Sequence, residues 1–223
     1  MFDAEIIDLQ LQDSGAAADS IRKYQPKNGR AFLAAKRSFD IAAAIILLPF
    51  VALAGLILLV LNPAFNKGTL MFCQTRMGKD CVPFTAYKFR SMMDVGTVKR
   101  GAFDALEEDR ITKLGAIMRK LRIDELPQAI NILKGDMSLV GPRPDYIDHA
   151  KVYLKDIPGY RERYNVRPGV TGLAQTEVGY VSDEIGFRRK VAADLMYIQK
   201  MSLPYDLRVI YRTVIIVVGR HGR

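Results

Sequence analysis

The sequence has too few cysteine and histidine side chains for a disulfide framework or a zinc site. Its two cysteines, Cys73 and Cys81, and its two histidines, His149 and His221, also lie too far apart for a shared metal site. We therefore expect two ordinary thiols in a reducing compartment. With 49% apolar and 26% charged residues, the 223-residue chain is neither disordered nor fibrous, and it has the length of one or two domains.

The beginning of the chain lacks basic residues, which argues against a secretory signal peptide. Residues 1–19 carry five acidic side chains and no lysine or arginine, whereas residues 20–40 carry six basic ones. Glycine and small polar residues interrupt both segments. We predict that residues 1–30 form a flexible arm.

No charged residue occurs between positions 41 and 61, and this run is the clearest structural signal in the chain. As a helix it would be about 31 Å long, close to the hydrocarbon thickness of a bilayer. Pro49 near its middle removes one backbone hydrogen bond and predicts a kink. Basic residues flank both ends, so charge alone leaves two topologies open: a straight crossing, or entry and exit through one leaflet.

The chain after Gly68 mixes strand and helix patterns. Aromatic and β-branched residues predict strands within 69–73 and 82–89, joined as a hairpin. Apolar residues at helical spacing predict further helices at 111–121, 126–133, about 184–201 and 204–219. The last of these places arginines among apolar residues, which suits a membrane-interface helix and a buried amphipathic helix equally well.

Two adjacent carboxylates, Asp124 and Glu125, stand between two predicted helices and are the best candidates for chemistry. In one interpretation Asp124 is only the N-cap of the helix that Pro127 begins. In the other, a helix N-terminus keeps the carboxylate ionised and attracts phosphate. An ionised aspartate can attack phosphorus, and a carboxylate pair suits Mg²⁺ that bridges to a diphosphate.

Basic residues in loops complete a candidate site for an anionic substrate. Arg119, Lys120 and Arg122 stand shortly before the carboxylates, and strand alternation places Lys88 and Arg90 on one side. Arg143 is fixed between two prolines, and Arg163 lies before a Pro-Gly turn. Arginine forks match phosphate oxygens, and the net charge of +9 also predicts an anionic partner.

Six short motifs follow one another between Lys36 and Gln175. They are KRSFD at 36–40, QTRMG at 74–78, YKFRSM at 87–92, IDELPQ at 123–128, KGDMSLVGPRP at 134–144 and RPGVTGLAQ at 167–175. Any one of them is weak, but six in this order are highly specific. They resemble those of the monotopic phosphoglycosyl transferases, bacterial enzymes that start exopolysaccharide and glycan assembly on polyprenyl phosphate, and the resemblance runs from Lys36 to about Thr213.

The resemblance implies a UDP-sugar donor, Mg²⁺, a polyprenyl phosphate (undecaprenyl phosphate) acceptor and release of UMP. It implies that Asp124 is the nucleophile and that Glu125, with Asp124, holds Mg²⁺ or assists the lipid phosphate. By the same resemblance Lys88, Arg119 and Arg143 bind the phosphates or the nucleotide. Asp194 matches a further acid of the active site.

The fold expected from pattern and resemblance together is α+β and mainly helical, in a monotopic membrane protein. Residues 31–66 would form a re-entrant hydrophobic helix broken at Pro49, and residues 67–223 a cytoplasmic catalytic domain with interfacial helices and a small β element. The expected location is the cytoplasmic face of the bacterial inner membrane. Membrane lipid and downstream glycosyltransferases are the expected partners, and a homodimer is left open.

Two departures from the family pattern bear on these expectations. Leu48, rather than a serine, precedes Pro49, and residues 176–180 lack the arginine that helps other members bind the nucleotide. Tyr180 is a candidate to stack on uracil instead. Galactose or glucose is the preferred sugar, with an N-acetylated sugar left open.

Two other kinds of protein compete with the transferase. A single-span anchor carrying a basic domain for nucleic acid or anionic lipid would explain the net charge and the apolar run. It would not explain an acidic pair among arginines, and the absence of a known nucleic-acid motif leads us to expect no nucleic-acid partner. An inactive scaffold would not need the intact Asp124-Glu125 pair.

Overall fold

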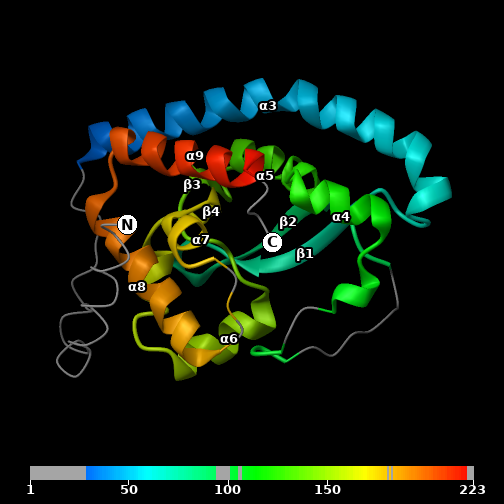
Figure 1. Cartoon of the computed structure of the whole chain (residues 1–223). Coiled ribbons are helices and arrows are strands. Elements are labelled where there is room, and N and C mark those ends of the chain that lie inside the picture. The colour runs from blue at the N-terminus through cyan, green and yellow to red at the C-terminus, as the bar shows by residue number, and fades with distance from the viewer. Residues whose placement is uncertain (1–28, 94–100, 105–106, 180, 182, 220–223) are drawn as a thin grey trace.

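Helices dominate the described part of the chain, and one long helix arches over the rest of the molecule (Figure 1). The computed structural model describes residues 29–93, 101–104, 107–179, 181 and 183–219. Two two-stranded sheets accompany the helices within these residues. The predicted α+β, mainly helical class is confirmed.

The arching helix is α3, Arg30–Phe65, which contains the whole predicted apolar run. The helix was predicted to break at Pro49, and the structure corrects this. Pro49 lies inside one continuous, bowed helix and does not end it (Figure 1). A proline removes a single intrahelical hydrogen bond, which a helix of 36 residues tolerates. Only 11% of its most apolar window is buried, unlike the core helix of a soluble protein. By length and composition α3 is the one helix of the described chain that could cross a membrane.

The N-terminal half of α3 is fixed to the domain by two buried polar side chains. Lys36 Nζ donates hydrogen bonds to Asp206 Oδ2 at 2.6 Å and to the carbonyl oxygen of Val140 at 3.1 Å. Asp40 Oδ1 accepts a hydrogen bond from Ser138 Oγ at 3.0 Å. Burying these groups is tolerable because each one is paired.

The C-terminal end of α3 returns to the same domain. Asn66 Nδ2 donates to the carbonyl oxygen of Arg90, and Arg90 Nη2 donates to the carbonyl oxygen of Asn66, both at 2.6 Å. Gly68 leaves room for this arrangement, since a Cβ there would lie 2.1 Å from the Arg90 guanidinium. Because both ends of α3 bind one domain, a straight crossing of a bilayer would break one set of contacts. The arrangement agrees with monotopic anchoring.

Strands β1, Met71–Met77, and β2, Pro83–Phe89, form the predicted antiparallel hairpin. The second sheet is parallel and pairs β3, Ser138–Val140, with β4, Gly169–Thr171. No strand was predicted there, since the Gly- and Pro-rich segments 140–144 and 166–172 were expected to form loops. The backbones approach closely there, since a Cβ on Gly169 would lie 2.1 Å from the amide nitrogen of Gly141. This sheet brings two Gly- and Pro-rich segments together beneath α3.

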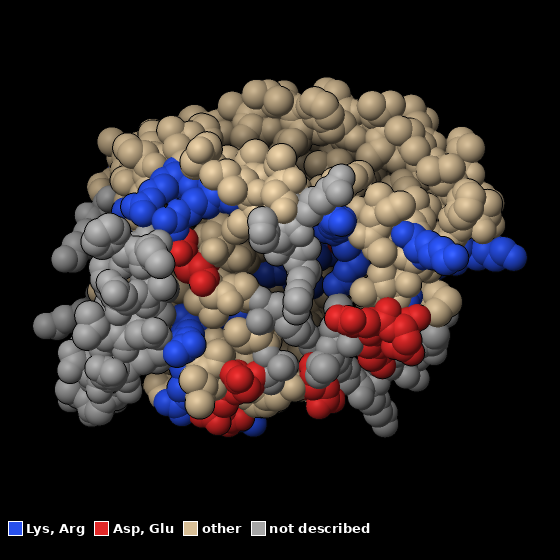
Figure 2. Space-filling view, in the orientation of Figure 1, with Lys and Arg blue, Asp and Glu red and all other residues tan. Residues whose placement is uncertain are grey.

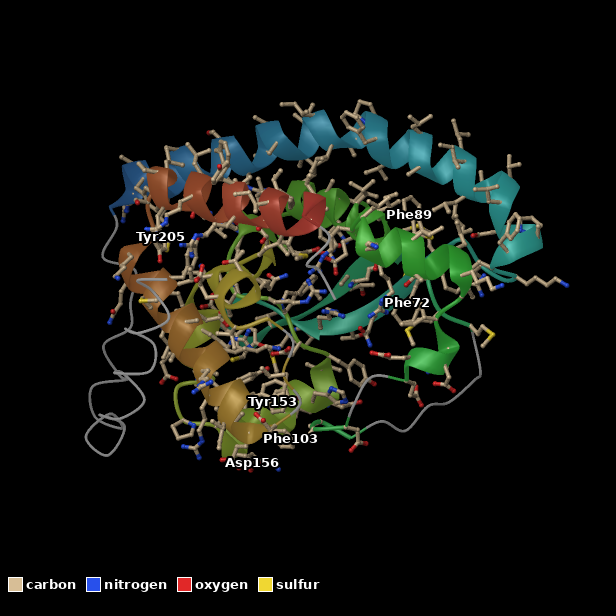
Figure 3. The ribbon with its side chains drawn as sticks, viewed as in Figure 1. Phe72, Phe89, Phe103, Tyr153, Asp156 and Tyr205 are labelled. Carbon is tan, nitrogen blue, oxygen red and sulfur yellow. The ribbon has the colours of Figure 1, made fainter. Side chains whose placement is uncertain are left out.

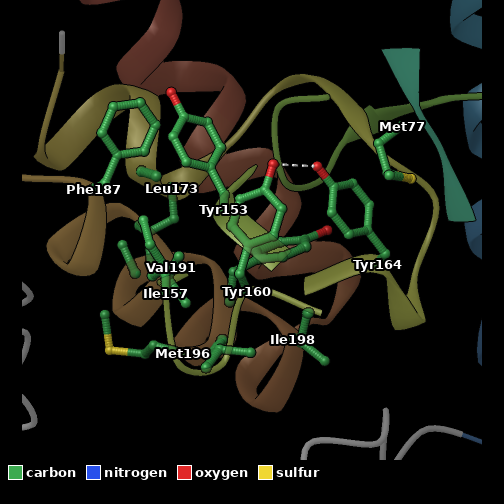
Figure 4. Close-up of a cluster of buried hydrophobic side chains, with 14 of the residues drawn as sticks. Met77, Tyr153, Ile157, Tyr160, Tyr164, Leu173, Phe187, Val191, Met196 and Ile198 are labelled. Carbon is green, nitrogen blue, oxygen red and sulfur yellow. Dashed lines mark hydrogen bonds between the residues drawn. The ribbon is translucent and has the colours of Figure 1, made fainter. Parts of the chain in front are cut away.

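The remaining helices pack below α3. They are α4, Lys113–Lys120; α5, Gln128–Lys134; α6, Ile147–Asp156; α7, Leu173–Glu177; α8, Glu184–Lys200; and α9, Leu203–Val218, with short 3₁₀ turns η2, Lys79–Cys81; η3, Glu108–Arg110; η4, Ile123–Glu125; and η5, Glu162–Asn165. Of these, α6, α7, α8 and α9 enclose the main core. The core is rich in tyrosine: Tyr153, Tyr160 and Tyr164 are fully buried, and the last two share a hydrogen bond of 2.9 Å (Figure 4). The predicted helices at 184–201 and 204–219 are confirmed as α8 and α9.

An apolar face covers one side of the molecule. It consists of exposed large hydrophobic side chains on α3 and α9, of which Ile46, Phe50, Val60, Val214 and Val218 are examples. On the face that Figure 2 shows, the upper rim of the molecule, where α3 runs, is free of charged side chains, and lysines and arginines lie below it. Soluble monomers usually expose large hydrophobic side chains singly or in small patches rather than along a whole helix. For α9 this favours the interfacial helix over the buried one.

Candidate active site

The chain between α4 and α5 is shaped so that Asp124 and Glu125 share one tight turn. Arg122, two residues after the end of α4, has the left-handed backbone conformation, with φ 56° and ψ 19°, and η4 begins at the next residue. The N-cap of α5 is Pro127, without a side-chain cap. The interpretation of Asp124 as N-cap of the next helix is therefore wrong, because a separate 3₁₀ turn intervenes. Asp124 and Glu125 are both buried, with 7% and 5% of their surface exposed.

Glu125 binds three cationic side chains. Lys88 Nζ donates to Glu125 Oε1 at 2.7 Å, Arg122 Nη1 to Oε2 at 3.3 Å, and both terminal nitrogens of Arg143 donate to the carboxylate. Burial alone would raise the pKa of Glu125, but the charges of Arg143 and Lys88 outweigh it and hold that pKa well below its usual range. Glu125 is thus ionised and fixed in position.

Asp124 differs from its neighbour in having an open oxygen. Its Oδ1 is buried without a hydrogen-bond partner. Burial raises the pKa of Asp124 and the charge of Glu125 adds to this, while Lys88 and Arg119 pull the pKa down. A buried polar atom with no partner calls for an explanation. Substrate or a cation would supply the missing partner.

The cations around the pair outnumber its two negative charges. Burial lowers the pKa of Lys88 to about 8, which Glu125 opposes and Arg143 reinforces. Arg76, next to Arg143, was not among the predicted site residues; burial first and then the Arg143 charge lower its pKa to about 10. Its side chain is held by the carbonyl oxygen of Pro144 at 2.6 Å. This surplus of positive charge favours an anionic ligand.

The predicted residues Arg163 and Asp194 lie together, behind Arg143 rather than at the carboxylate pair. Arg163 Nη1 contacts Asp145 Oδ2 at 2.5 Å and its Nη2 contacts Asp194 Oδ2 at 2.7 Å. The same Nη2 donates to the carbonyl oxygen of Arg143 at 2.9 Å. Burial raises the pKa of Asp194 to about 6 although Arg163 opposes it. This cluster supports the backbone that presents Arg143 to Glu125.

Arg90 is a third predicted substrate-binding residue that the fold does not bring to the pair. It is 5% exposed, lies one residue beyond β2, and its guanidinium contacts Asn66 at the end of α3. Strand alternation ends with the strand, so it does not govern Arg90. Tyr180 lies outside the described residues. Of the neighbouring segment, Glu177 forms an ion pair with Arg212 on α9.

A cavity of about 170 Å³ adjoins the acidic pair. Arg122 and Glu125 are the charged residues of its lining, Asp124 is not among the lining residues, and most of the remaining lining is apolar. Glu125 is therefore buried in the protein but reachable from this cavity. A site with one charged end and an otherwise apolar wall suits a ligand of the same composition.

Asp124 and Glu125 are the donor set available for a divalent cation. The described residues contain no group of three or more His, Cys, Asp or Glu side chains that could hold a metal ion. Mg²⁺ rarely needs one, because one or two carboxylates usually hold it together with waters and substrate phosphates. The unpartnered Oδ1 of Asp124 is an available ligand, whereas the charge of Glu125 is already compensated. The residues fit Mg²⁺ shared with a diphosphate.

A buried acidic pair among arginines, close to an apolar face, is typical of a membrane-bound enzyme that acts on phosphate-containing substrates. Residues 31–220 match the bacterial sugar transferase family. The chain belongs to this family, which confirms the predicted one.

Three relatives illustrate the likeness. The chain is 42% identical over 188 residues to a UDP-N-acetylgalactosamine-undecaprenyl-phosphate N-acetylgalactosaminephosphotransferase of Aeromonas hydrophila, covering 84% of this chain and 44% of that protein. It is 42% identical over 192 residues to a UDP-glucose:undecaprenyl-phosphate glucose-1-phosphate transferase of Caulobacter vibrioides, covering 80% and 68%. It is 39% identical over 193 residues to the exopolysaccharide production protein PSS of Rhizobium leguminosarum bv. phaseoli, covering 82% and 94%. The chain thus spans less than half of the Aeromonas protein and most of the Rhizobium protein.

Proposed function

We propose that this protein transfers a sugar 1-phosphate from a UDP-sugar to polyprenyl phosphate, with Asp124 as the nucleophile. The observation that carries the proposal is the contrast within the acidic pair: Glu125 is held by three cations, while Asp124 Oδ1 is buried and open. The names of two relatives, which act on UDP-sugars and undecaprenyl phosphate, support the same reaction class.

The reaction proceeds in two displacements at one phosphorus atom. An oxygen of ionised Asp124 attacks the β-phosphorus of the UDP-sugar, the bond to the bridging oxygen breaks, and UMP leaves with that oxygen. The sugar phosphate is then bound to the carboxylate as an acyl phosphate. An oxygen of the lipid phosphate attacks the same phosphorus, the bond to Asp124 breaks, and the products are polyprenyl diphosphate sugar and the free carboxylate.

The surrounding residues bind and orient the phosphates. Arg143, Lys88 and Arg76 supply positive charge where the diphosphate gains negative charge, at sites buried enough for that charge to act strongly. Glu125 keeps Lys88 and Arg143 in place. Mg²⁺ held by Asp124, Glu125 and the substrate would add Lewis-acid stabilisation of the same phosphates.

The position of the acidic turn beside the apolar face explains how two unlike substrates meet. A nucleotide sugar dissolves in water, whereas polyprenyl phosphate stays in the membrane, so transfer requires a site at the interface. We place the domain at the cytoplasmic face of the bacterial inner membrane, at the first membrane step of exopolysaccharide synthesis. Downstream glycosyltransferases would then extend the product.

The sugar is a matter for experiment, because the relatives' names include both N-acetylgalactosamine and glucose. Purified protein in a membrane mimic should be given polyprenyl phosphate and Mg²⁺ with a panel of UDP-sugars, including the UDP forms of galactose and glucose. Release of UMP with at least one of them is expected. If none releases UMP, the proposed function is wrong.

The nucleophile is tested by Asp124→Asn. This variant should release no UMP and should not gain the mass of a sugar phosphate, whereas the wild type incubated without acceptor should gain it. Asp156→Asn is the matched control, since Asp156 is an exposed carboxylate on α6, on the side away from α3 (Figure 3). An active Asp124→Asn protein would reject the assignment.

A basic domain that binds nucleic acid on a membrane anchor is the second candidate, and it accounts for the net charge and the apolar run but not for the acidic pair. The cations of the site point instead toward Glu125 inside the domain. Salt-sensitive binding of RNA or DNA without UMP release from any UDP-sugar would favour this candidate.

A further inference from the structure

The cavity that Arg122 and Glu125 line is a groove between α5, β4, α7 and α9, and most of its lining is apolar. Its apolar lining comes from segments far apart in the chain: Leu47 on α3, Ala129 and Ile132 on α5, Val170 on β4, and Ile216 and Val217 on α9. Two threonines in the wall satisfy each other, with 2.6 Å between the hydroxyl oxygens of Thr171 and Thr213. Gln175 and Thr176 of α7 also line the groove, and Gln175 Oε1 is buried without a hydrogen-bond partner. Most of the wall is apolar and offers hydrocarbon contacts.

The groove opens within the apolar face. Next to its lining residues on α9, Val214, Ile215 and Val218 are 53%, 48% and 74% exposed. Next to Leu47 on α3, Ile46 is 66% exposed. A chain that leaves the groove would pass directly onto the surface that α3 and α9 present to lipid.

Arg122 stands at the charged end of the groove in an unusual backbone conformation. It follows the last residues of α4 with φ 56°, where helices most often place glycine. Glycine would adopt this φ without strain, but here an arginine occupies the position and its guanidinium lies beside Glu125. The guanidinium is 37% exposed and touches Glu125 only at 3.3 Å, which leaves most of its hydrogen-bonding fork for a ligand.

We propose that this groove binds the lipid acceptor, with Arg122 on its phosphate and the apolar lining around the isoprene units nearest the phosphate. The inference rests on the proposed function and adds to it the location of one substrate. A volume of about 170 Å³ is smaller than the ~300–1,000 Å³ of sites that enclose drug-sized ligands. The groove therefore holds only the first part of the chain, and the rest stays in the membrane.

Charge complementarity selects this occupant. A phosphate monoester on a hydrocarbon chain matches a groove that has an arginine at one end and aliphatic side chains along its length. A membrane phospholipid shares that chemistry in part, but its phosphate is a diester with a bulky headgroup, which the charged end beside Glu125 would have to accommodate. Competition between the two lipids is therefore part of the test.

Val217→Trp tests the groove by filling it. If the larger side chain displaces two methylene groups' worth of contact, the KM for polyprenyl phosphate should rise roughly ten-fold. The KM for the UDP-sugar should change less than two-fold. Val218→Trp is the matched control on the same helix, outside the lining, and should leave both KM values at the wild-type level.

Arg122 is tested by comparing Arg122→Gly with Arg122→Ala. Both lose the charged hydrogen bonds to phosphate, so both should raise the acceptor KM about ten-fold or more. Arg122→Gly should have the higher Tm of the two, because glycine accepts the positive φ without strain. An acceptor KM that stays at the wild-type value in these variants would overturn the role of Arg122.

A polyprenyl phosphate carrying a photoreactive group in its first isoprene unit gives a direct readout. We expect this probe to label peptides from α5 and α9. Excess unlabelled polyprenyl phosphate should abolish the labelling, whereas excess phospholipid should not. Labelling confined to other segments, equal competition by phospholipid, or an unchanged acceptor KM in Val217→Trp would overturn the groove. A wild-type protein that releases no UMP would instead refute the proposed function, so the two failures are distinguishable.

Discussion

Replacing the two neighbouring carboxylates one at a time by amides should change stability in opposite directions. Glu125→Gln removes the negative charge that compensates Lys88 and Arg143, whose side chains are only 14% and 30% exposed. Breaking a buried ion pair by removing one partner costs about 3–5 kcal/mol, because the other charge stays behind. The loss should therefore be large for a substitution that changes almost no volume.

Asp124→Asn should cost nothing or stabilise the fold. The pKa of Asp124 is raised in the folded state, so the folded protein favours the protonated form more than the unfolded chain does. At neutral pH the ionised carboxylate thus lowers stability, and an uncharged side chain removes that cost. We expect a change between zero and a gain of about 1 kcal/mol, with complete loss of activity.

Thermal unfolding of both variants in one detergent should show this contrast. The chain has no tryptophan, so loss of helical circular dichroism is a better signal than intrinsic fluorescence. A loss of 3–5 kcal/mol corresponds to a Tm lower by roughly 6–20 °C for Glu125→Gln. Glu184→Gln is the control, because Glu184 is 55% exposed and pairs only across the surface with Arg188. Its effect should stay within about 1 kcal/mol. Equal Tm shifts for the two buried carboxylates would refute the reasoning.

Three further predictions concern pH and the attachment of α3. The rate should rise with pH as Asp124, the proposed nucleophile, ionises above the usual carboxylate range, and fall above about pH 8 as Lys88 loses its charge; Lys88→Arg should extend the alkaline side of the measured profile. Arg90→Ala should speed tryptic cleavage after Lys67 without changing the KM for the UDP-sugar, because Arg90 holds the end of α3; a higher KM with unchanged cleavage would restore its predicted binding role. Lys36→Met should destabilise the protein by about 3–5 kcal/mol, and Asp206→Asn in the same background should recover part of that loss in thermal unfolding.

Local pattern was enough to predict the main elements. The uncharged run predicted α3, the alternation within 69–89 predicted the hairpin, and the helical spacing predicted α8 and α9. The β3–β4 sheet was missed because strands of three residues in Gly- and Pro-rich segments show no period. It forms through the close approach of two backbones, which only the tertiary structure brings together.

The site was predictable as a set of residues but not as a set of partners. The acidic pair with Lys88 and Arg143 was named from charge and position, and the fold joins them. Arg122 was seen only as a basic neighbour, because the sequence gives no sign of its positive φ. Arg90 was assigned to the site by strand alternation, but β2 ends at Phe89, one residue before it. Sequence spacing tells which side of a strand a residue faces, not which segment later covers it.

The depth of the acidic turn relative to lipid follows from how α3 rests on α5. Ala44 of α3 is fully buried against Ala129 and Ile132 of α5, and α5 begins three residues after Glu125. The membrane helix and the acidic turn are thus fixed to each other through one short helix. Because the Lys36 and Asn66 contacts secure α3 at its two ends, α3 cannot tilt independently of the turn. The helix that anchors the domain in the membrane therefore also fixes how far the two carboxylates lie from the hydrocarbon.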